Sequence, residues 1–563
     1  MLRVRWLGQV PYEEAHALQR ALHDRGSDDY LLMLEHPHVV TLGVRAEMSH
    51  VLVDPASVGA HLVRTDRGGD VTYHGPGQLV VYPLLSIPMG TRAVPCYVHS
   101  VEQVVIDALG DLGFEPGRLG RLDGFPGVWV DPDGASPRKI CAIGIRVTKG
   151  RSMHGLALNV DPDIGWFSRI VPCGIADKPV TSLALEGLEL SMAEVVDAVC
   201  DRAVAAWAHD GRFDRQDVAG LRPRGLTEAQ RFDPEHPADR DARSPGPNLK
   251  IRLRQAGVDP DHAIALVERK PPWLRAPVVM GDRFRRTGRT LHELDLVTVC
   301  EEAGCPNIYE CWADGTATFM INGDRCTRAC GFCLVDTRRP LAVDPAEPSR
   351  VAEAISRMGL AHAVITAVAR DDLQDGGAAG FASTIRSVRE RCPSTTIEVL
   401  IPDCKGDAAS LDVIFGERPE ILNHNLETVA RLQRAVRPSA GYARSLSLLA
   451  RAAGSGLVTK SGLILGMGET RDEVLGALAD LRAVGVSIVT LGQYLRPSAR
   501  HVPVARWWTP EEFADIGSAA RQIGFDHVEA SPLTRSSYHA RAAMESAGAG
   551  GPGRASAHEA VIA

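Results

Sequence analysis

The sequence has 563 residues, of which 45% are hydrophobic and 23% charged, with a net charge of -8 and an isoelectric point near 6.2. This length allows two large domains or about three ordinary ones, each with its own core. The mildly acidic charge gives no electrostatic reason to expect nucleic acid or a membrane surface as a partner, and we predict neither.

The first residues lack the apolar core of a signal peptide, and no apolar run approaches the roughly 18 residues that span a bilayer. We therefore expect a cytoplasmic protein. Such a compartment keeps thiols reduced, so the 12 cysteines are expected to be metal ligands, nucleophiles or core residues rather than disulfides.

Residues 1–213 mix helical and strand-like patterns. Apolar residues recur at helical spacing in three segments: 12–26, 97–114 and 191–210. Strand-like runs lie between these helices, at 30–36, 78–85, 127–130, 139–147 and 154–160. Strands clustered between helices predict an α/β domain around one mixed sheet.

The segment RGGDVTYHGPGQ, residues 67–78, is a glycine-rich loop that could approach a ligand closely, although such loops are often only turns. Further along, Cys173 lies between a proline and a glycine, on a turn that could expose its sulfur. A nucleophilic cysteine needs its thiolate, which Lys139 would favour if the fold brings the two together. A buried, unreactive cysteine is the alternative.

Residues 214–268 are rich in proline, arginine, aspartate and glycine and predict a linker or extended arm, with a short helix possible at 261–270. From 269 to 563 the pattern becomes regular. Short strand-like runs at 316–321, 361–368, 395–401, 419–425, 456–465, 486–493 and 526–530 alternate with helical stretches such as 348–359 and 471–485. Repeated β–α units predict a parallel sheet, open or closed into a barrel.

Six cysteines form two triplets: Cys300, Cys305 and Cys311, then Cys326, Cys330 and Cys333. Thiolates hold iron–sulfur clusters, and three ligands leave one iron of a cubane open for a small molecule. Structural zinc is the alternative, but it prefers four ligands in closely spaced pairs, and neither triplet is paired in that way.

The second triplet, CTRACGFC, resembles the signature of radical-SAM enzymes, and CEEAGCPNIYECW resembles the second-cluster signature of lipoyl synthases. The resemblance continues through RDDLQDGGA, NHNLETV, TKSGLILGMGET, TLGQYLRPS and RSSYHA, and covers about residues 270–540. It implies a partial (β/α) barrel that holds two [4Fe–4S] clusters and S-adenosylmethionine (SAM).

By this resemblance, the cluster on Cys326, Cys330 and Cys333 would bind SAM, and cleavage of SAM would give a radical that abstracts hydrogen from an unactivated carbon. The cluster on Cys300, Cys305 and Cys311 would take Ser537 as its fourth ligand and supply sulfur. Contacts to SAM or substrate are expected, by position, from Asn423, Asn425, Lys460, Gln493 and Arg496. Ala369 departs from the acidic or hydroxyl residue expected there.

In the first region, RGGDVTYHGPGQ, the lysine of RKICAIG, the segment HGLALNV and the cysteine of PCG follow one another as in the lipoyl (octanoyl) transferase family, which has the biotin/lipoate protein ligase fold. The resemblance covers about residues 1–208. It implies that Cys173 takes octanoate from acyl carrier protein as a thioester, with Lys139 favouring the thiolate, and that a carrier lysine then receives it. The implied acyl-channel residues are Arg67, Gly68, Gly69, Asp70, Val71, Thr72, Tyr73, His74, Ala142, Ile143, Gly144, Gly155, Leu156 and Ala157.

Together the two resemblances predict a bifunctional enzyme that octanoylates a carrier and then inserts two sulfur atoms. Expected partners are acyl carrier protein, the lipoyl domains of 2-oxoacid dehydrogenases, the glycine-cleavage H protein and an external electron donor. Three alternatives stay open: an ATP-dependent lipoate ligase in the first half, another sulfur-inserting radical-SAM enzyme in the second, and a zinc-binding interaction module.

Overall fold

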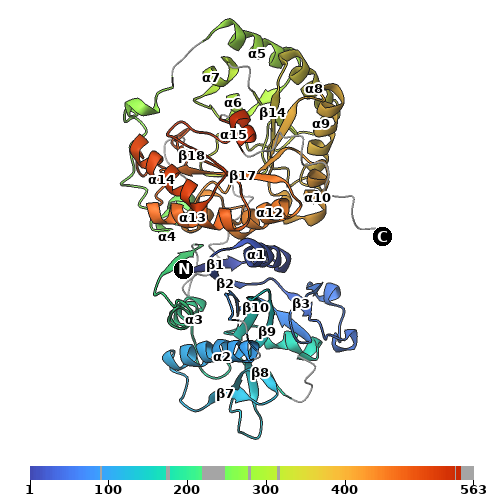
Figure 1. Ribbon diagram of the computed structural model, residues 1–563, viewed down its shortest axis with the longest axis vertical. Coiled ribbons are helices and arrows are strands. Elements are labelled where there is room, and N and C mark those ends of the chain that lie inside the picture. Colours follow the sequence, from blue (N-terminus) through green and yellow to red (C-terminus); the bar gives the residue numbers. More distant parts are fainter. Residues whose placement is uncertain are drawn as a thin grey trace. The chain divides into compact units, whose positions relative to one another are not determined.

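The computed structural model describes residues 1–88, 90, 92–172, 178–218, 247–276, 280–313, 317–538 and 540–546. The chain divides into two compact units, Met1–His236 and Pro237–Ala563, whose elements are labelled in Figure 1. Among the described residues, no helix is both long and apolar enough to cross a membrane.

The first unit is built on an eight-stranded mixed sheet in the order β11-β1-β2-β6-β10-β9-β8-β7. Its strands are β1 (Leu2–Gln9), β2 (Asp29–Glu35), β6 (Gln78–Leu84), β7 (Leu119–Leu122), β8 (Phe125–Val130), β9 (Arg138–Thr148), β10 (Arg151–Asn159) and β11 (Phe213–Asp217). A smaller sheet has the order β4-β3-β5, from β3 (Val39–Leu42), β4 (His61–Arg64) and β5 (Val71–His74). The mixed sheet is the one that the sequence predicts.

Helices cover both faces of the large sheet: α1 (Tyr12–Arg25) lies on one face, and α2 (Ala93–Asp111) and α3 (Met192–Trp207) lie on the other (Figure 1). Alternate residues of each strand supply the two cores, because successive side chains point to opposite faces. Leu31 and Met33 of β2 pack in the cluster formed with α2 and α3. A capping box begins α3, where the Ser191 hydroxyl and the Glu194 carboxylate each bind the other residue's backbone N–H.

Two parts of the predicted arm lie in folded elements. Strand β11 pairs in parallel with β1, and the Asp214 carboxylate binds Arg5 at 2.8 Å and Arg3 at 3.1 Å. The strand is therefore held by charge pairs rather than by an apolar pattern, which is why its sequence resembles a linker. Further along the arm, α4 (Pro247–Gln255) packs in the second unit. Residues 219–246 of the arm lie outside the described residues.

The second unit is an open barrel of parallel strands. The sheet order is β12-β13-β14-β15-β16-β17-β18-β19, and all neighbours from β13 onward are parallel. Its strands are β12 (Val297–Thr298), β13 (Thr318–Ile321), β14 (His362–Ala367), β15 (Thr396–Leu400), β16 (Ile421–Asn423), β17 (Val458–Leu465), β18 (Ile488–Gln493) and β19 (His527–Ala530). This is the partial barrel that the resemblance implies.

Helices surround this sheet on its outer face, as Figure 1 shows. They are α8 (Glu347–Met358), α9 (Ala378–Arg391), α10 (Ala408–Gly416), α11 (Gln433–Val436), α12 (Tyr442–Gly454), α13 (Arg471–Ala483) and α14 (Pro510–Ile523). Three further helices, α5 (Asp282–Glu293), α6 (Val299–Glu302) and α7 (Ile308–Ala313), precede β13. The last helix, α15 (Ala540–Ser546), packs its Ala543 and Met544 against Ile421, Val458 and Ile488 at the amino ends of three strands.

A buried ion pair crosses the barrel interior. The Lys460 ammonium donates to both Glu398 carboxylate oxygens, at 3.0 and 3.1 Å, and both side chains are fully buried. Burial alone would raise the pKa of Glu398, but the Lys460 charge outweighs it and holds that pKa below its ordinary value. The Asn423 amide also donates to Glu398, so the strands β15, β16 and β17 share one polar layer.

Candidate active sites

A narrow pocket in the first unit lies between β5, the loop before it, and strands β9 and β10. Its lining residues are Tyr12, Arg67, Gly68, Gly69, Asp70, Thr72, His74, Tyr82, Ala142, Ile143, Gly144, His154, Gly155, Leu156 and Ala157. Twelve of the fourteen expected acyl-channel residues are among them. Three lining residues were not predicted: Tyr12 and Tyr82, which carry no local signal, and His154, which begins the quoted segment HGLALNV.

Val71 and Tyr73 differ from the prediction, because their side chains point away from the pocket. They belong to a separate hydrophobic cluster with Trp166 and Phe167. Residues 71–74 form strand β5, and alternate residues of a strand face opposite sides. The eight-residue run 67–74 therefore cannot line one channel with every residue.

Two glycines make the close approach of strands around this pocket possible. A Cβ at Gly155 would lie 2.1 Å from the Val81 carbonyl oxygen, and one at Gly68 would lie 2.9 Å from that of Ile145. Because both obstacles are backbone atoms, any larger residue must push β10 away from β6 or the loop away from β9.

His74 is held at the pocket wall in a defined, neutral form. Its Nδ1 lies 2.7 Å from Oε1 of Gln78, and the Gln78 amide donates in turn to Oδ1 of Asn159 at 2.9 Å. Since the Gln78 oxygen can only accept, His74 carries its proton on Nδ1 and leaves Nε2 as an acceptor. Burial, with the nearby His36, lowers the pKa of His74 to about 3, so the ring is uncharged at neutral pH.

Two further histidines share one carboxylate beside the pocket. Oδ1 of Asp66 lies 2.8 Å from Nε2 of His154 and 3.4 Å from Nε2 of His16. The three ligand atoms lie within 4.8 Å of one another. Arg146 and Arg20 pair with the other Asp66 oxygen, so arginine charges already balance this carboxylate and disfavour a metal cation.

Lys139 lies on β9, next to residues 179–181, which follow the predicted nucleophile Cys173 in the sequence. Its backbone N–H donates to the Pro179 carbonyl and its carbonyl accepts from the Thr181 N–H, both at 2.9 Å. Its side chain is buried, with the ammonium 4.7 Å from the centre of the Trp129 ring. Cys173 lies outside the described residues, and residue 178 is the first described residue after it.

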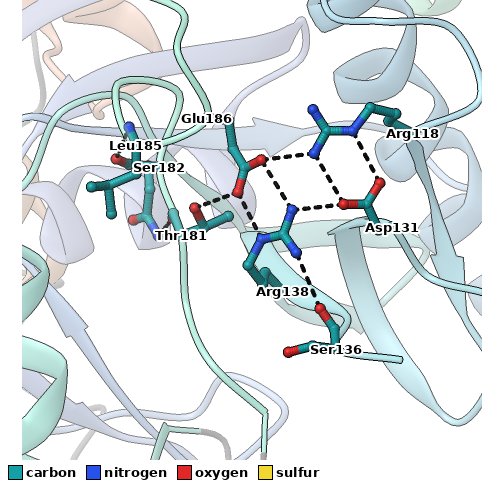
Figure 2. Close-up of polar contacts among 9 residues, drawn as sticks. Arg118, Asp131, Ser136, Arg138, Thr181, Ser182, Leu185 and Glu186 are labelled. Carbon is teal, nitrogen blue, oxygen red and sulfur yellow. Dashed lines mark hydrogen bonds and ion pairs between the residues drawn. The ribbon is translucent and has the colours of Figure 1, made fainter. Parts of the chain in front are cut away.

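An ionic network includes Arg138 and Thr181, which neighbour this junction, and Figure 2 shows its contacts. The Glu186 carboxylate accepts from Arg138 at 2.8 and 3.1 Å, from Arg118 at 3.0 Å and from the Thr181 hydroxyl at 2.8 Å. Both arginines also bind Asp131. The hydrogen bond from Arg138 holds the pKa of Glu186 below its usual range. Arg138, which directly precedes Lys139, and Thr181, whose N–H binds the Lys139 carbonyl, are thus tied to one carboxylate.

In the second unit, one large cavity at the carboxyl ends of the strands brings together every predicted cluster ligand. Its lining includes Cys300, Cys305, Cys311, Cys326, Cys330, Cys333 and Ser537. The cavity has about 1880 Å³ of empty space, part of it open to solvent. This end of a parallel barrel is where catalytic groups from several strands meet.

The first triplet and Ser537, more than two hundred residues apart, are joined by two side-chain contacts. The Asn307 amide donates to the Leu533 carbonyl at 2.7 Å, and the Tyr538 hydroxyl donates to the Glu310 carboxylate at 3.2 Å. Asn307 and Glu310 lie between Cys305 and Cys311. The fold therefore places the serine loop directly against the loop of the first triplet.

The second triplet lies on a loop held by backbone contacts. The Gly331 N–H donates to the Val436 carbonyl at 2.8 Å, and the Val502 N–H donates to the Gly331 carbonyl at 2.7 Å. Nε2 of His501 lies 2.8 Å from the Cys333 carbonyl oxygen. Neighbouring segments thus fix the loop without using the three sulfur atoms.

The thiols fit iron–sulfur clusters better than a single metal ion. Burial raises the pKa of Cys300 to about 11 and that of Cys333 to about 12, so they need an adjacent cation to become thiolates. A zinc ion with bonds of about 2.3 Å would need its thiolates within about 4 Å of one another. No three of these six described sulfur atoms lie within 4.8 Å of one another.

Five charged residues of the cavity were missed: Arg328, Asp403, Glu427, Arg437 and Arg535. Arg328, Glu427 and Arg535 lie inside quoted motifs, Arg437 follows the motif NHNLETV by eight residues, and Asp403 lies in no quoted motif. Arg328 pairs with Asp371 and Asp403. Glu427 has a positive φ of 68° and a pKa raised by burial. The motifs could have pointed to the three inside them, since charged residues in a cavity have to be paired or to face a ligand.

The five residues expected to contact SAM or substrate fall into two groups. Asn425 and Gln493 line the cavity, and Oδ1 of Asn425 is buried without a hydrogen-bond partner. Asn423 and Lys460 instead bind Glu398 in the polar layer, because that buried carboxylate needs hydrogen-bond donors and a countercharge. Arg496 donates to backbone carbonyls of its own loop, including that of His501. At the departure noted above, Ala369 lines the cavity and its carbonyl accepts from Thr327.

Family comparisons agree with this division. Residues 11–203 match the lipoyl protein ligase A/B catalytic domain, 261–305 the N-terminal domain of lipoyl synthase of the radical SAM family, and 320–481 the radical SAM superfamily. A bipartite lipoate protein ligase structure from Thermoplasma acidophilum aligns with 38% of this chain and 86% of its own, at 19% identity and a TM-score of 0.33.

Two curated relatives match the second unit closely. The lipoyl synthase of Mycobacterium avium is 54% identical over 292 residues, 52% of this chain and 93% of the relative. That of Mycolicibacterium paratuberculosis is 54% identical over 274 residues, 49% of this chain and 89% of the relative. The chain therefore belongs to the lipoyl synthase family of radical SAM enzymes and carries, before that region, a lipoyl protein ligase A/B catalytic domain.

Proposed function

We propose that this chain builds the lipoyl group on a carrier protein in two consecutive reactions. In the first, octanoate passes from acyl carrier protein to Cys173 and then to a carrier lysine. In the second, two sulfur atoms are inserted into the bound octanoyl chain. The main support is that six cysteines and Ser537, spread from residue 300 to residue 537, line one cavity.

The first reaction is a pair of acyl exchanges. The Cys173 thiolate attacks the octanoyl thioester, its S–C bond forms, and the acyl carrier thiol leaves. The carrier lysine amine then attacks that carbonyl, the amide bond forms, Cys173 leaves as thiolate and the nitrogen loses a proton. A Lys139 ammonium on β9 would favour the thiolate. The pocket with Ile143, Leu156 and Ala157 in its wall has the apolar lining that an acyl chain needs.

The second reaction depends on bound cofactors. SAM and iron–sulfur clusters supply the radical chemistry that removes hydrogen from an unactivated carbon. We assign one [4Fe–4S] cluster to Cys326, Cys330 and Cys333, and a second to Cys300, Cys305, Cys311 and Ser537. Asn425 and Gln493, with the unpaired Oδ1 of Asn425, are suited to holding SAM.

The two reactions share one carrier, for which we propose the lipoyl domains of 2-oxoacid dehydrogenases and the glycine-cleavage H protein. An external electron donor is also required. Because the described cysteines are free, a reducing compartment such as the cytoplasm suits the reaction. Joining the two units raises the local concentration of the second site around a newly octanoylated carrier.

The test is an anaerobic reaction of the reconstituted chain with octanoyl-acyl carrier protein, a lipoyl domain, SAM and reductant, followed by intact mass of the lipoyl domain. We expect the octanoyl mass to appear first and the dithiolated mass to follow. The Cys173→Ala chain should fail at the first step but convert a domain that is already octanoylated. Full activity of Cys173→Ala with ATP and free octanoate would instead identify a lipoate ligase.

A further inference from the structure

Helix α5, outside the proposed cavity, has two sharply different faces. One face is apolar and packs on α7: the Phe284 ring lies 5.5 Å from that of Tyr309 and 5.1 Å from that of Trp312. The Thr287 hydroxyl donates to the Trp312 carbonyl at 3.3 Å. Residues four apart on a helix share a face, so the opposite face is directed outward.

The outward face of α5 carries arginines without acidic partners. Arg283, Arg286 and Arg289 are exposed, follow one another at three-residue spacing, and have no ion-pair partner among the described residues. Arg285 is also exposed and pairs with Asp282 at 3.4 Å. In a chain with a net charge of -8, three unpaired cations on one helix form a local positive surface, which we call the α5 arginine face.

This face lies one helix layer from the predicted cluster ligands. Helix α7, on which α5 packs, contains Cys311, and Cys311 lines the cavity. A helix with its side chains is about 10–12 Å across, whereas an octanoyl group on an extended lysine side chain reaches about 15 Å from the carrier backbone. In Figure 1, α5 and α7 lie side by side at the end of the second unit.

We propose that the α5 arginine face is a docking surface for the octanoylated carrier domain, and that it binds an acidic patch near the modified lysine. The inference rests on the proposed function, because it names the protein that delivers the substrate to the same cavity. A positive surface one helix layer from the cavity attracts an anionic partner and orients it before the acyl arm enters.

The test compares a folded carrier with a short substrate that has no docking surface. We would measure sulfur insertion by the reconstituted full chain on an octanoylated lipoyl domain and on an octanoyl-lysine peptide. The triple variant R283E/R286E/R289E should raise KM for the domain at least tenfold at low salt and leave kcat and peptide turnover unchanged. Added salt should raise KM of the unmodified chain and have little effect on the variant.

Two controls separate docking from folding. R283K/R286K/R289K keeps the charges and should behave as the unmodified chain. Arg521→Glu reverses the charge of an exposed arginine on α14 that also lacks an ion-pair partner among the described residues, and it should not change KM.

An unchanged KM for the domain in the triple Glu variant, with the peptide still converted, would overturn the proposal. If the triple Glu variant loses binding to a DNA probe but keeps its KM for the domain, the face would be assigned to a polyanion instead. Failure of the unmodified chain on both substrates would count against the proposed function itself.

Discussion

The pocket of the first unit and the cavity of the second are built in opposite ways. Strand residues with short side chains, such as Gly144, Gly155 and Ala157, line the pocket together with the neutral His74 and His154. The cavity is lined by residues from loops at strand ends, many of them thiols or arginines. In the proposed function, the shape of the first site would hold an acyl chain, whereas the second would provide space and ligands for cofactors.

The same contrast extends to buried charge. Around the pocket, burial keeps histidines uncharged, with pKa values of about 3 for His16, His74 and His154 and about 4 for His36. Below the cavity, a charged carboxylate is kept charged by Lys460. We therefore expect the stability of the first unit to depend more on pH and that of the second unit to depend more on its buried ion pair.

The largest expected effect is acid unfolding of the first unit before the second. Between pH 6.5 and about 3–4 the four histidines are protonated in the unfolded state but stay neutral while buried in the folded state. The free energy of unfolding therefore decreases as the pH is lowered. At pH 5 the loss is about 2 kcal/mol per histidine, or roughly 8 kcal/mol together, comparable with the stability of a domain. Among its described residues the second unit has one comparable histidine, His424, with a pKa of about 4.

Tryptophan fluorescence and circular dichroism between pH 7 and 4, with limited proteolysis to tell the units apart, would measure this. Replacement of His74 by Gln should reduce the pH slope by about one proton. If both units unfold at one pH, the contrast in buried histidines does not control acid stability.

A second prediction concerns the charged layer of the second unit. Lys460→Met removes one partner of a buried ion pair and should destabilise that unit by about 3–5 kcal/mol, because Glu398 is left buried without a countercharge. The double variant with Glu398→Gln should recover most of the loss. Urea unfolding of the full chain, followed separately in each unit, should leave the transition of the first unit unchanged. A shift in the transitions of both units would contradict this prediction.

The third and smallest expected effect is a change in acyl-chain selection. Ala157→Leu adds volume to the wall of the narrow pocket, where Ala157 is buried, so octanoyl transfer should fall about a hundredfold while shorter acyl donors are retained. Overpacking is expected to cost about 1–3 kcal/mol of stability. Sulfur insertion on a domain that is already octanoylated serves as the control and should not change. Equal loss for all acyl lengths would argue that the pocket does not hold the chain.

The sequence was sufficient to predict the two fold classes and to identify residues of the two sites that lie within recognisable motifs. The six cysteines and Ser537 meet in one cavity, and twelve expected pocket residues meet in another. It was less informative where contacts cross the fold. Lys460 and Asn423 stand near strand ends, yet nothing local reveals that Glu398, more than twenty residues away, binds both. Strand β11 was missed because its charges, not an apolar pattern, fix it.

The network around Glu186 has a consequence for local opening of the chain. The amides of Lys139 and Thr181 are both hydrogen-bonded across the junction, and breaking either bond also strains the contacts of Glu186 with Arg138 and the Thr181 hydroxyl. Such linked contacts open together rather than one at a time. In hydrogen exchange these two amides should therefore behave as one slow cooperative element, and the strand that carries Lys139 should keep its protection when the edges of the sheet fray.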